Sequence, residues 1–220
     1  MSTFNSALQI TSISVSLLTA GGIATLSLFY VPILRAQPAS HSLPSVRWLF
    51  SRGSHVFPTA AIISAAGFST LAYRSLPVSL ASRTVLQLLR DTKVRGYLVA
   101  AALNIAIAPW TSRVMIPNNF ELIRVNNELG GHRSIAGFQA ARKSKDSLRQ
   151  RGARDSVDGK GEGVDQFKDI SDPQSQTTRS PSSLEDEKVK AMLTKFGAQN
   201  FVRAAFTLAG GVAVLLTALG

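Results

Sequence analysis

The chain has 220 residues, 45% of them hydrophobic, and a formal net charge of +11, which fits a single domain. It contains no cysteine, which excludes disulfides, thiol nucleophiles and thiolate metal sites. Residues 131–190 hold 12 Lys/Arg and 10 Asp/Glu, so this segment is nearly neutral and most of the positive charge lies in the rest of the chain, beside the apolar stretches. Basic residues at membrane borders contact lipid headgroups, which are therefore favoured over nucleic acid as the partner.

The first apolar stretch, residues 6–34, predicts a membrane-spanning helix. No charge occurs before Arg35, and the stretch exceeds the ~20 apolar residues that a span needs. It lacks the positive start and the short apolar run of a secretory signal, so we expect a retained helix.

Three further spans are expected at residues 53–73, 94–115 and 196–219. Trp48, in the short loop after the first span, is a candidate interface anchor. Residues 82–91 of the second loop could form a short amphipathic surface helix. The sequence IPNN at 116–119 is expected to end the third span, before a polar helix at 120–129.

The composition changes sharply at Gly130. Residues 130–183 are polar and almost free of apolar clusters, so they predict a largely disordered insert, with weak helicity at 139–151. Residues 184–195 are expected to lead helically into the last span. The predicted fold is all-α, a four-transmembrane-helix bundle forming one membrane domain over 1–220. We expect a multi-pass integral protein of an intracellular membrane, with its orientation left open.

Four spans place the end of the first, the start of the second, the end of the third and the start of the fourth on one membrane face. Unusual polar and aromatic residues gather at these ends. They are Tyr30, Trp48, His55, Trp110, Arg113, Asn118, Asn119, Asn200 and Arg203. Because ionisable groups at membrane depth usually face the bundle interior, a pocket is predicted at this end.

Simpler roles compete with this hypothesis. Arg113 and Arg203 lie near helix ends and could snorkel to headgroups. His55 could be an interfacial residue without chemistry, and Asn118 or Asn119 could cap the helix at 120–129. Mid-span Asn104 is expected to hydrogen-bond between helices.

Four sequence blocks resemble the anthrone oxygenases of fungal polyketide pathways, a family with bacterial relatives. They are LSLFYVPIL at 26–34, WLFSRG at 48–53 followed by Pro58, APWTSRVMIPNN at 108–119, and FGAQNFVRA at 196–204. The family usually has threonine where Asn118 stands and often tryptophan where Phe196 stands. The resemblance covers about residues 10–129 and 192–219 and leaves out the insert.

The resemblance implies oxidation of a polyketide anthrone to an anthraquinone by dioxygen in secondary metabolism, with no flavin, haem or metal. An anthrone ionises to an electron-rich anthrolate that can reduce dioxygen directly. His55 is the candidate base, because its ordinary pKa suits proton transfer near neutral pH. Arg113 and Arg203 are the candidates for holding the anion. Asn118, Asn119 and Asn200 would supply neutral hydrogen bonds, and Tyr30, Trp48 and Trp110 would stack on the ring system.

Two other function classes stay open. One is a non-enzymatic four-helix membrane scaffold, and the other is a small lipid-binding or substrate-binding protein resembling a transporter. The clustering of arginine and asparagine at one end favours a pocket over a plain scaffold. A transporter would more often carry paired ionisable groups at the midplane, where Asn104 is the clear polar residue.

Overall fold

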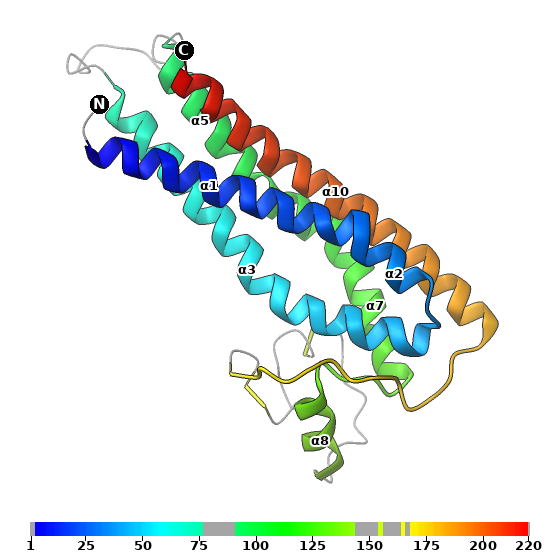
Figure 1. Ribbon diagram of the computed structural model, residues 1–220. Coiled ribbons are helices and arrows are strands. Elements are labelled where there is room, and N and C mark those ends of the chain that lie inside the picture. Colours follow the sequence, from blue (N-terminus) through cyan, green and yellow to red (C-terminus); the bar gives the residue numbers. More distant parts are fainter. Residues whose placement is uncertain (1–2, 77–90, 144–153, 156–163, 166–167, 220) are drawn as a thin grey trace. The chain divides into compact units, whose positions relative to one another are not determined.

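The computed structural model describes residues 3–76, 91–143, 154–155, 164–165 and 168–219 (Figure 1). The regular elements among them are all helical. They are α1 (Thr3–Thr25), η1 (Leu26–Tyr30), α2 (Val31–Arg35), α3 (Ala39–Arg74), α5 (Thr92–Ile105), α6 (Ile107–Trp110), η3 (Thr111–Met115), α7 (Ile116–Glu128), α8 (Ile135–Lys143) and α10 (Ser183–Leu219), where η marks a π-helical turn.

Four helical stretches are long and apolar enough to cross a membrane: Thr3–Arg35, Ala39–Arg74, Thr92–Glu128 and Ser183–Leu219. They confirm the predicted all-α, four-span fold class of a multi-pass integral membrane protein. The expected surface helix at 82–91 falls almost entirely outside the described residues.

The chain divides into two compact units. The first unit comprises Met1–Thr25, Val56–Ser112 and Asn200–Gly220, and the second comprises Leu26–His55 and Arg113–Gln199. The uncharged stretches at 56–73, 96–112 and 204–220 all belong to the first unit.

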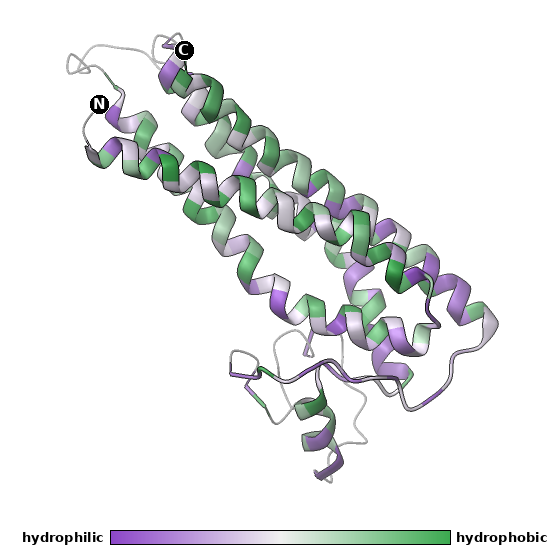
Figure 2. Cartoon of the chain, in the orientation of Figure 1, coloured by the Kyte–Doolittle hydropathy of each residue, from purple (hydrophilic) through white to green (hydrophobic). Residues whose placement is uncertain are grey.

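The first unit has a mixed interior of apolar and polar side chains and a largely apolar exterior. A core of Ile13, Phe68, Leu71, Tyr97, Ala100 and Val214 is joined by buried Gln9, Ser12, Ser16, Asn104 and Thr207. Leu18 and Leu216 are 76% and 68% exposed, and Figure 2 shows the apolar residues along α1, α5 and α10. In lipid an exposed leucine costs nothing, and interior polar groups must find partners within the protein.

Small residues let the helices of the first unit approach closely. A Cβ on Gly67 would come within 1.9 Å of Ser12 Oγ, and one on Gly96 would lie equally close to Thr217 Oγ1. These contacts join α3 to α1 and α5 to α10. The small side chains are therefore required by helix packing, as expected for membrane bundles.

The second unit contains η1, α2, α7, α8 and the adjoining parts of α3 and α10. Phe50 and Phe196 pack edge to face with centroids 5.1 Å apart. Ser27 Oγ donates to the carbonyl oxygen of Gly197 at 2.8 Å, and the Ala39 amide donates to Asp186 at 2.7 Å. These contacts fix α3 and α10 beside the end of the first span.

Two predicted boundaries are wrong. Residues 116–119 do not end the third span, because the chain continues helically through η3 into α7 with Pro117 in the first turn of α7. A proline there costs little, since first-turn amides have no intrahelical acceptor. Trp48 lies within α3, which begins at Ala39, so the loop after the first span is much shorter than expected.

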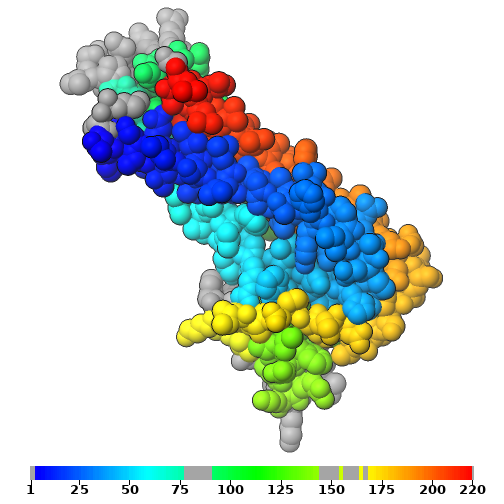
Figure 3. Space-filling view, in the orientation of Figure 1, coloured from blue at the N-terminus to red at the C-terminus, as the bar shows by residue number. Residues whose placement is uncertain are grey.

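The predicted disorder of the insert does not extend to residues 130–143 and 168–182. The first segment includes α8, and the second lies between α8 and the early part of α3 (Figure 3). The Thr177 amide donates to the Ser40 carbonyl at 2.9 Å, and the Ile135 amide donates to the Asp172 carbonyl at 2.9 Å. Specific hydrogen bonds, rather than an apolar core, order these segments. Most of 144–163 lies outside the described residues.

Candidate functional site

The strongest site candidate is Arg203, in the part of α10 that belongs to the first unit. Its side chain is only 8% exposed, and Asn200, one turn earlier, is fully buried. Arg203 Nη1 donates to Asn200 Oδ1 at 3.1 Å. This burial contradicts the alternative that Arg203 snorkels to headgroups.

The guanidinium of Arg203 is incompletely satisfied. Its Nε is buried and has no hydrogen-bond partner within the described part of the chain. Among the described residues of the first unit the single carboxylate side chain belongs to Asp91. That carboxylate is occupied at the start of α5, where it accepts from the amides of Lys93 and Val94 at 2.9 and 3.0 Å. A buried cation without a counter-ion is the arrangement expected of an anion-binding group.

An aromatic pair joins α6 to the same stretch of α10. Trp110 and Phe206 meet edge to face at 6.1 Å between ring centroids. Phe206 follows Arg203 by three residues, a spacing that puts two side chains on one face of a helix. Trp110, Asn200 and Arg203 are the members of the predicted set that belong to the first unit.

A polar network fixes the helix that carries Arg203. Ser16 Oγ lies 3.0 Å from Asn104 Oδ1 and 2.9 Å from the carbonyl oxygen of Thr207. Asn104 Nδ2 donates to the Ala100 carbonyl at 3.0 Å. The predicted interhelical role of Asn104 is confirmed, and the network ties α1 and α5 to α10 one turn beyond Arg203.

The other predicted residues lie in the second unit. Asn118 Nδ2 donates to the Met192 carbonyl at 3.1 Å, joining α7 to α10. The capping role considered for Asn118 and Asn119 is wrong, because α7 begins at Ile116 and both lie inside it. Asn119 keeps a buried Oδ1 without a hydrogen-bond partner among the residues described.

Tyr30, His55 and Arg113 complete the predicted set. Tyr30 ends η1 and is half-buried, with its hydroxyl 3.5 Å from the Ser45 carbonyl. His55 is half-buried in α3, and Arg113 is exposed in η3. Because the Arg113 side chain is exposed, the alternative that it reaches out to lipid headgroups stays open. Both π-helical turns, η1 and η3, fall inside the resemblance blocks, and such turns recur at functional sites. Convergence of all nine residues in one pocket stays a prediction.

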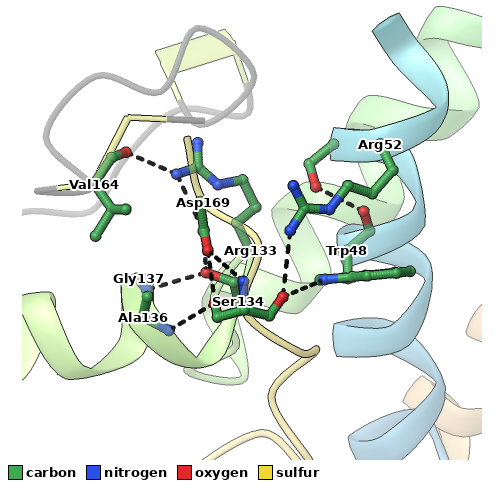
Figure 4. A network of polar contacts seen from close by, with 10 residues as sticks. Trp48, Arg52, Arg133, Ser134, Ala136, Gly137, Val164 and Asp169 are labelled. Carbon is green, nitrogen blue, oxygen red and sulfur yellow. Dashed lines mark hydrogen bonds and ion pairs between the residues drawn. The ribbon is translucent and has the colours of Figure 1, made fainter. Parts of the chain in front are cut away.

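Trp48 anchors the insert. Its Nε1 donates to the Ser171 carbonyl at 2.8 Å, and the guanidinium of Arg52 lies 5.3 Å from its ring centroid (Figure 4). Arg52 also donates to the Ser171 carbonyl, at 3.3 Å. The block WLFSRG therefore holds the insert against α3, and this contact was not predicted.

A buried ion pair also went unpredicted. Arg133 Nη2 lies 3.6 Å from Asp169 Oδ2 and donates to the Val164 carbonyl at 2.8 Å, as Figure 4 shows. Ser134 Oγ donates to Asp169 at 2.5 Å, and Ser171 Oγ donates at 2.6 Å. Burial alone would raise the pKa of Asp169. The serine hydrogen bonds and the charge of Arg133 outweigh it, so the pKa lies below the ordinary aspartate value.

No group of three or more His, Asp or Glu side chains suited to a metal ion occurs in the part of the chain that the structure describes. The candidate site thus consists of a buried arginine, amides and aromatic rings. The fold and this site define a multi-pass membrane protein with a buried arginine inside its apolar part.

The comparison with protein families agrees with that class. The anthrone oxygenase family matches residues 47–213, which is more than half of the chain and includes Trp110, Asn200 and Arg203. The chain belongs to the anthrone oxygenase family. No curated protein and no solved structure matches it.

Proposed function

We propose that this protein oxidises a polyketide anthrone to the corresponding anthraquinone with dioxygen, without a cofactor, in an intracellular membrane. The observation that carries the proposal is membership of the anthrone oxygenase family, which indicates an oxygenase acting on a small molecule. The arginine of the first unit supports it, because the reaction passes through an anion.

The reaction consumes one anthrone and one dioxygen and yields one anthraquinone and one water. A base removes a proton from the central methylene carbon to give the anthrolate. The anthrolate passes one electron to dioxygen, and the carbon radical combines with superoxide to give a peroxide, which is protonated. Loss of the second hydrogen of that carbon, with cleavage of the O–O bond, releases water and leaves the ketone.

Arg203 is the proposed holder of the anthrolate oxygen. Its buried Nε has a hydrogen to donate, and Asn200 orients the guanidinium through Nη1. A fixed positive donor in an apolar surrounding stabilises the anion more strongly than water-exposed charges do, so it favours the first proton transfer. Trp110 supplies an aromatic face on which a flat tricycle can stack.

His55 is the proposed base, and Arg113 the second cation. A neutral imidazole accepts a proton near neutral pH, where the acidic methylene of an anthrone can be ionised. Asn118, Asn119, Tyr30 and Trp48 are proposed as binding residues around the ring system.

The test measures oxidation of emodin anthrone under air by membranes that contain the protein. Membranes without it correct for slow autoxidation. Arg203→Gln should lower the rate at least tenfold, since removing one hydrogen-bond donor to an oxyanion typically costs ~10²–10³ in rate. Arg95→Gln is the matched control, because Arg95 is exposed in the same unit.

A rate no faster than the empty membranes would refute the oxygenase, and binding of the anthrone without turnover would favour the substrate-binding alternative. Equal activity of the two arginine variants would remove Arg203 from the site. His55→Gln should lower the rate strongly, since a positioned general base typically contributes ~10²–10⁴-fold, and an unchanged rate would reject His55 as the base.

A further inference from the structure

A groove between α7 and α10 lies wholly in the second unit. Its volume is about 400 Å³. The lining combines an apolar floor with charged rims: Pro117, Asn118, Glu121, Lys188, Ala191, Met192 and Lys195. Asn118 closes the floor through its hydrogen bond to the Met192 carbonyl. The groove is therefore built from both helices.

The groove holds an excess of positive charge. Glu121 accepts from Lys188 Nζ at 2.6 Å and from Arg124 at 2.6 and 2.7 Å, so its carboxylate is shared between two cations. Lys195 is exposed, and in the described residues it has neither an ion pair nor a hydrogen bond. An anion in the groove would supply the missing partner.

The level of the groove relative to the membrane follows from helix pairing. Gln199 Nε2 donates to the Val114 carbonyl at 2.9 Å, Asn118 pairs with Met192, and Glu121 pairs with Lys188, so the two segments run antiparallel. This register brings Lys195 close to the level of Arg113, the first charge after the uncharged stretch 96–112. Cations at such a boundary lie at the depth of lipid headgroups.

We propose that this groove is a binding site for an anionic phospholipid. Lys195 contacts the lipid phosphate, Lys188 contributes a second positive charge, and Pro117, Ala191 and Met192 contact the glycerol and the upper acyl chain. The pairing of a charged rim with an apolar floor distinguishes a lipid from a free phosphate ion, which would gain nothing from the floor. This proposal does not depend on the proposed oxidation.

The experiment uses the full chain in phosphatidylcholine nanodiscs. Binding of fluorescent phosphatidylserine is measured by titration, with unlabelled phosphatidylserine, phosphatidylcholine and inorganic phosphate as competitors. Lys195→Gln should weaken binding about fivefold, the equivalent of about 1 kcal/mol per lysine at a membrane surface. Glu121→Gln should strengthen binding, because it removes the negative charge of the groove and releases Lys188.

Lys190→Gln is the matched control. Lys190 lies on the same helix but pairs with Glu187 at 2.8 Å and does not line the groove. Unchanged binding by this variant supports the proposal. Equal weakening by Lys190→Gln and Lys195→Gln would overturn it in favour of general surface attraction. Displacement by inorganic phosphate, or by phosphatidylcholine as effectively as by phosphatidylserine, would also overturn it.

Discussion

Gly210→Ala should destabilise the first unit, because the backbone of α10 lies against Asn104 there. A Cβ at this position would come within 2.4 Å of Asn104 Nδ2 and 3.1 Å of the Ala100 carbonyl oxygen. The amide could rotate away only by giving up its contacts with Ser16 and Ala100. The carbonyl belongs to the backbone of α5 and cannot move without moving the helix.

The magnitude follows from three contributions. Overpacking of a filled interior costs about 1–3 kcal/mol. The interhelical hydrogen bond of Asn104 adds about 0.6 kcal/mol, the average in membrane bundles. Alanine gains up to about 1 kcal/mol over glycine from helix propensity, which offsets part of the loss. Gly21→Ala isolates the packing contribution, because a Cβ there has nothing within 4 Å and gains the same propensity.

The assay is reversible unfolding of the purified protein in mixed micelles by a denaturing detergent. Because both variants gain the same helix propensity, Gly210→Ala should lie about 1.6–3.6 kcal/mol below Gly21→Ala in the free energy of unfolding. Combining Gly210→Ala with Asn104→Ala should recover only part of the difference, since the clash with the Ala100 carbonyl remains. Equal stability of the two alanine variants would refute the close approach of α5 and α10.

Two further predictions concern the contact between the insert and α3. Because the pKa of folded Asp169 is lowered, its stabilising effect is complete above the unfolded aspartate pKa of about 3.9 and is lost as the pH falls through the folded value. In a Trp110→Phe background, the fluorescence of Trp48 should therefore report release of the insert from α3 at acid pH. In the Asp169→Asn variant the insert should already be released at neutral pH. Fluorescence of the protein with Asp169 intact that stays constant down to pH values well below about 3.9 would contradict this prediction. Trp48→Phe removes the bond to the Ser171 carbonyl and should weaken the docked state by about 1 kcal/mol, measured by hydrogen exchange of residues 168–182, and unchanged exchange would argue against the bond.

The spans were predictable because lipid imposes a length and an apolar composition that a single sequence displays directly. Two boundaries were not, because α3 already begins at Ala39 in a polar stretch and the third span continues as a helix through residues 116–119. The order of residues 168–182 rests on long-range hydrogen bonds from Trp48 and Ser40, and such bonds leave no periodic pattern in the sequence. Compositional bias alone therefore overestimated the disorder.

The candidate site, too, was predictable from the sequence only in part. The pairing of Asn200 with Arg203 follows from a spacing of three residues on one helix, and this spacing can be read directly from the sequence. The burial of Arg203 depends on the neighbours of α10 in space and could not be read from its position near a helix end. The bond of Asn118 to the Met192 carbonyl joins residues 74 positions apart, so no local rule could have predicted it.

The energetics of Arg203 support the proposal that this residue binds an anion. A buried arginine costs about 2.5–3.5 kcal/mol on insertion scales, whereas an interhelical polar contact in a membrane bundle returns about 0.6 kcal/mol. The bond to Asn200 therefore leaves most of the cost uncompensated, and no carboxylate among the described residues of that unit is available to offset it. A bound anion would supply the difference. Arg203→Leu should then raise the stability of the substrate-free protein while removing its stabilisation by an anthrone analogue, and a leucine variant that is less stable without ligand would show instead that the arginine is structural.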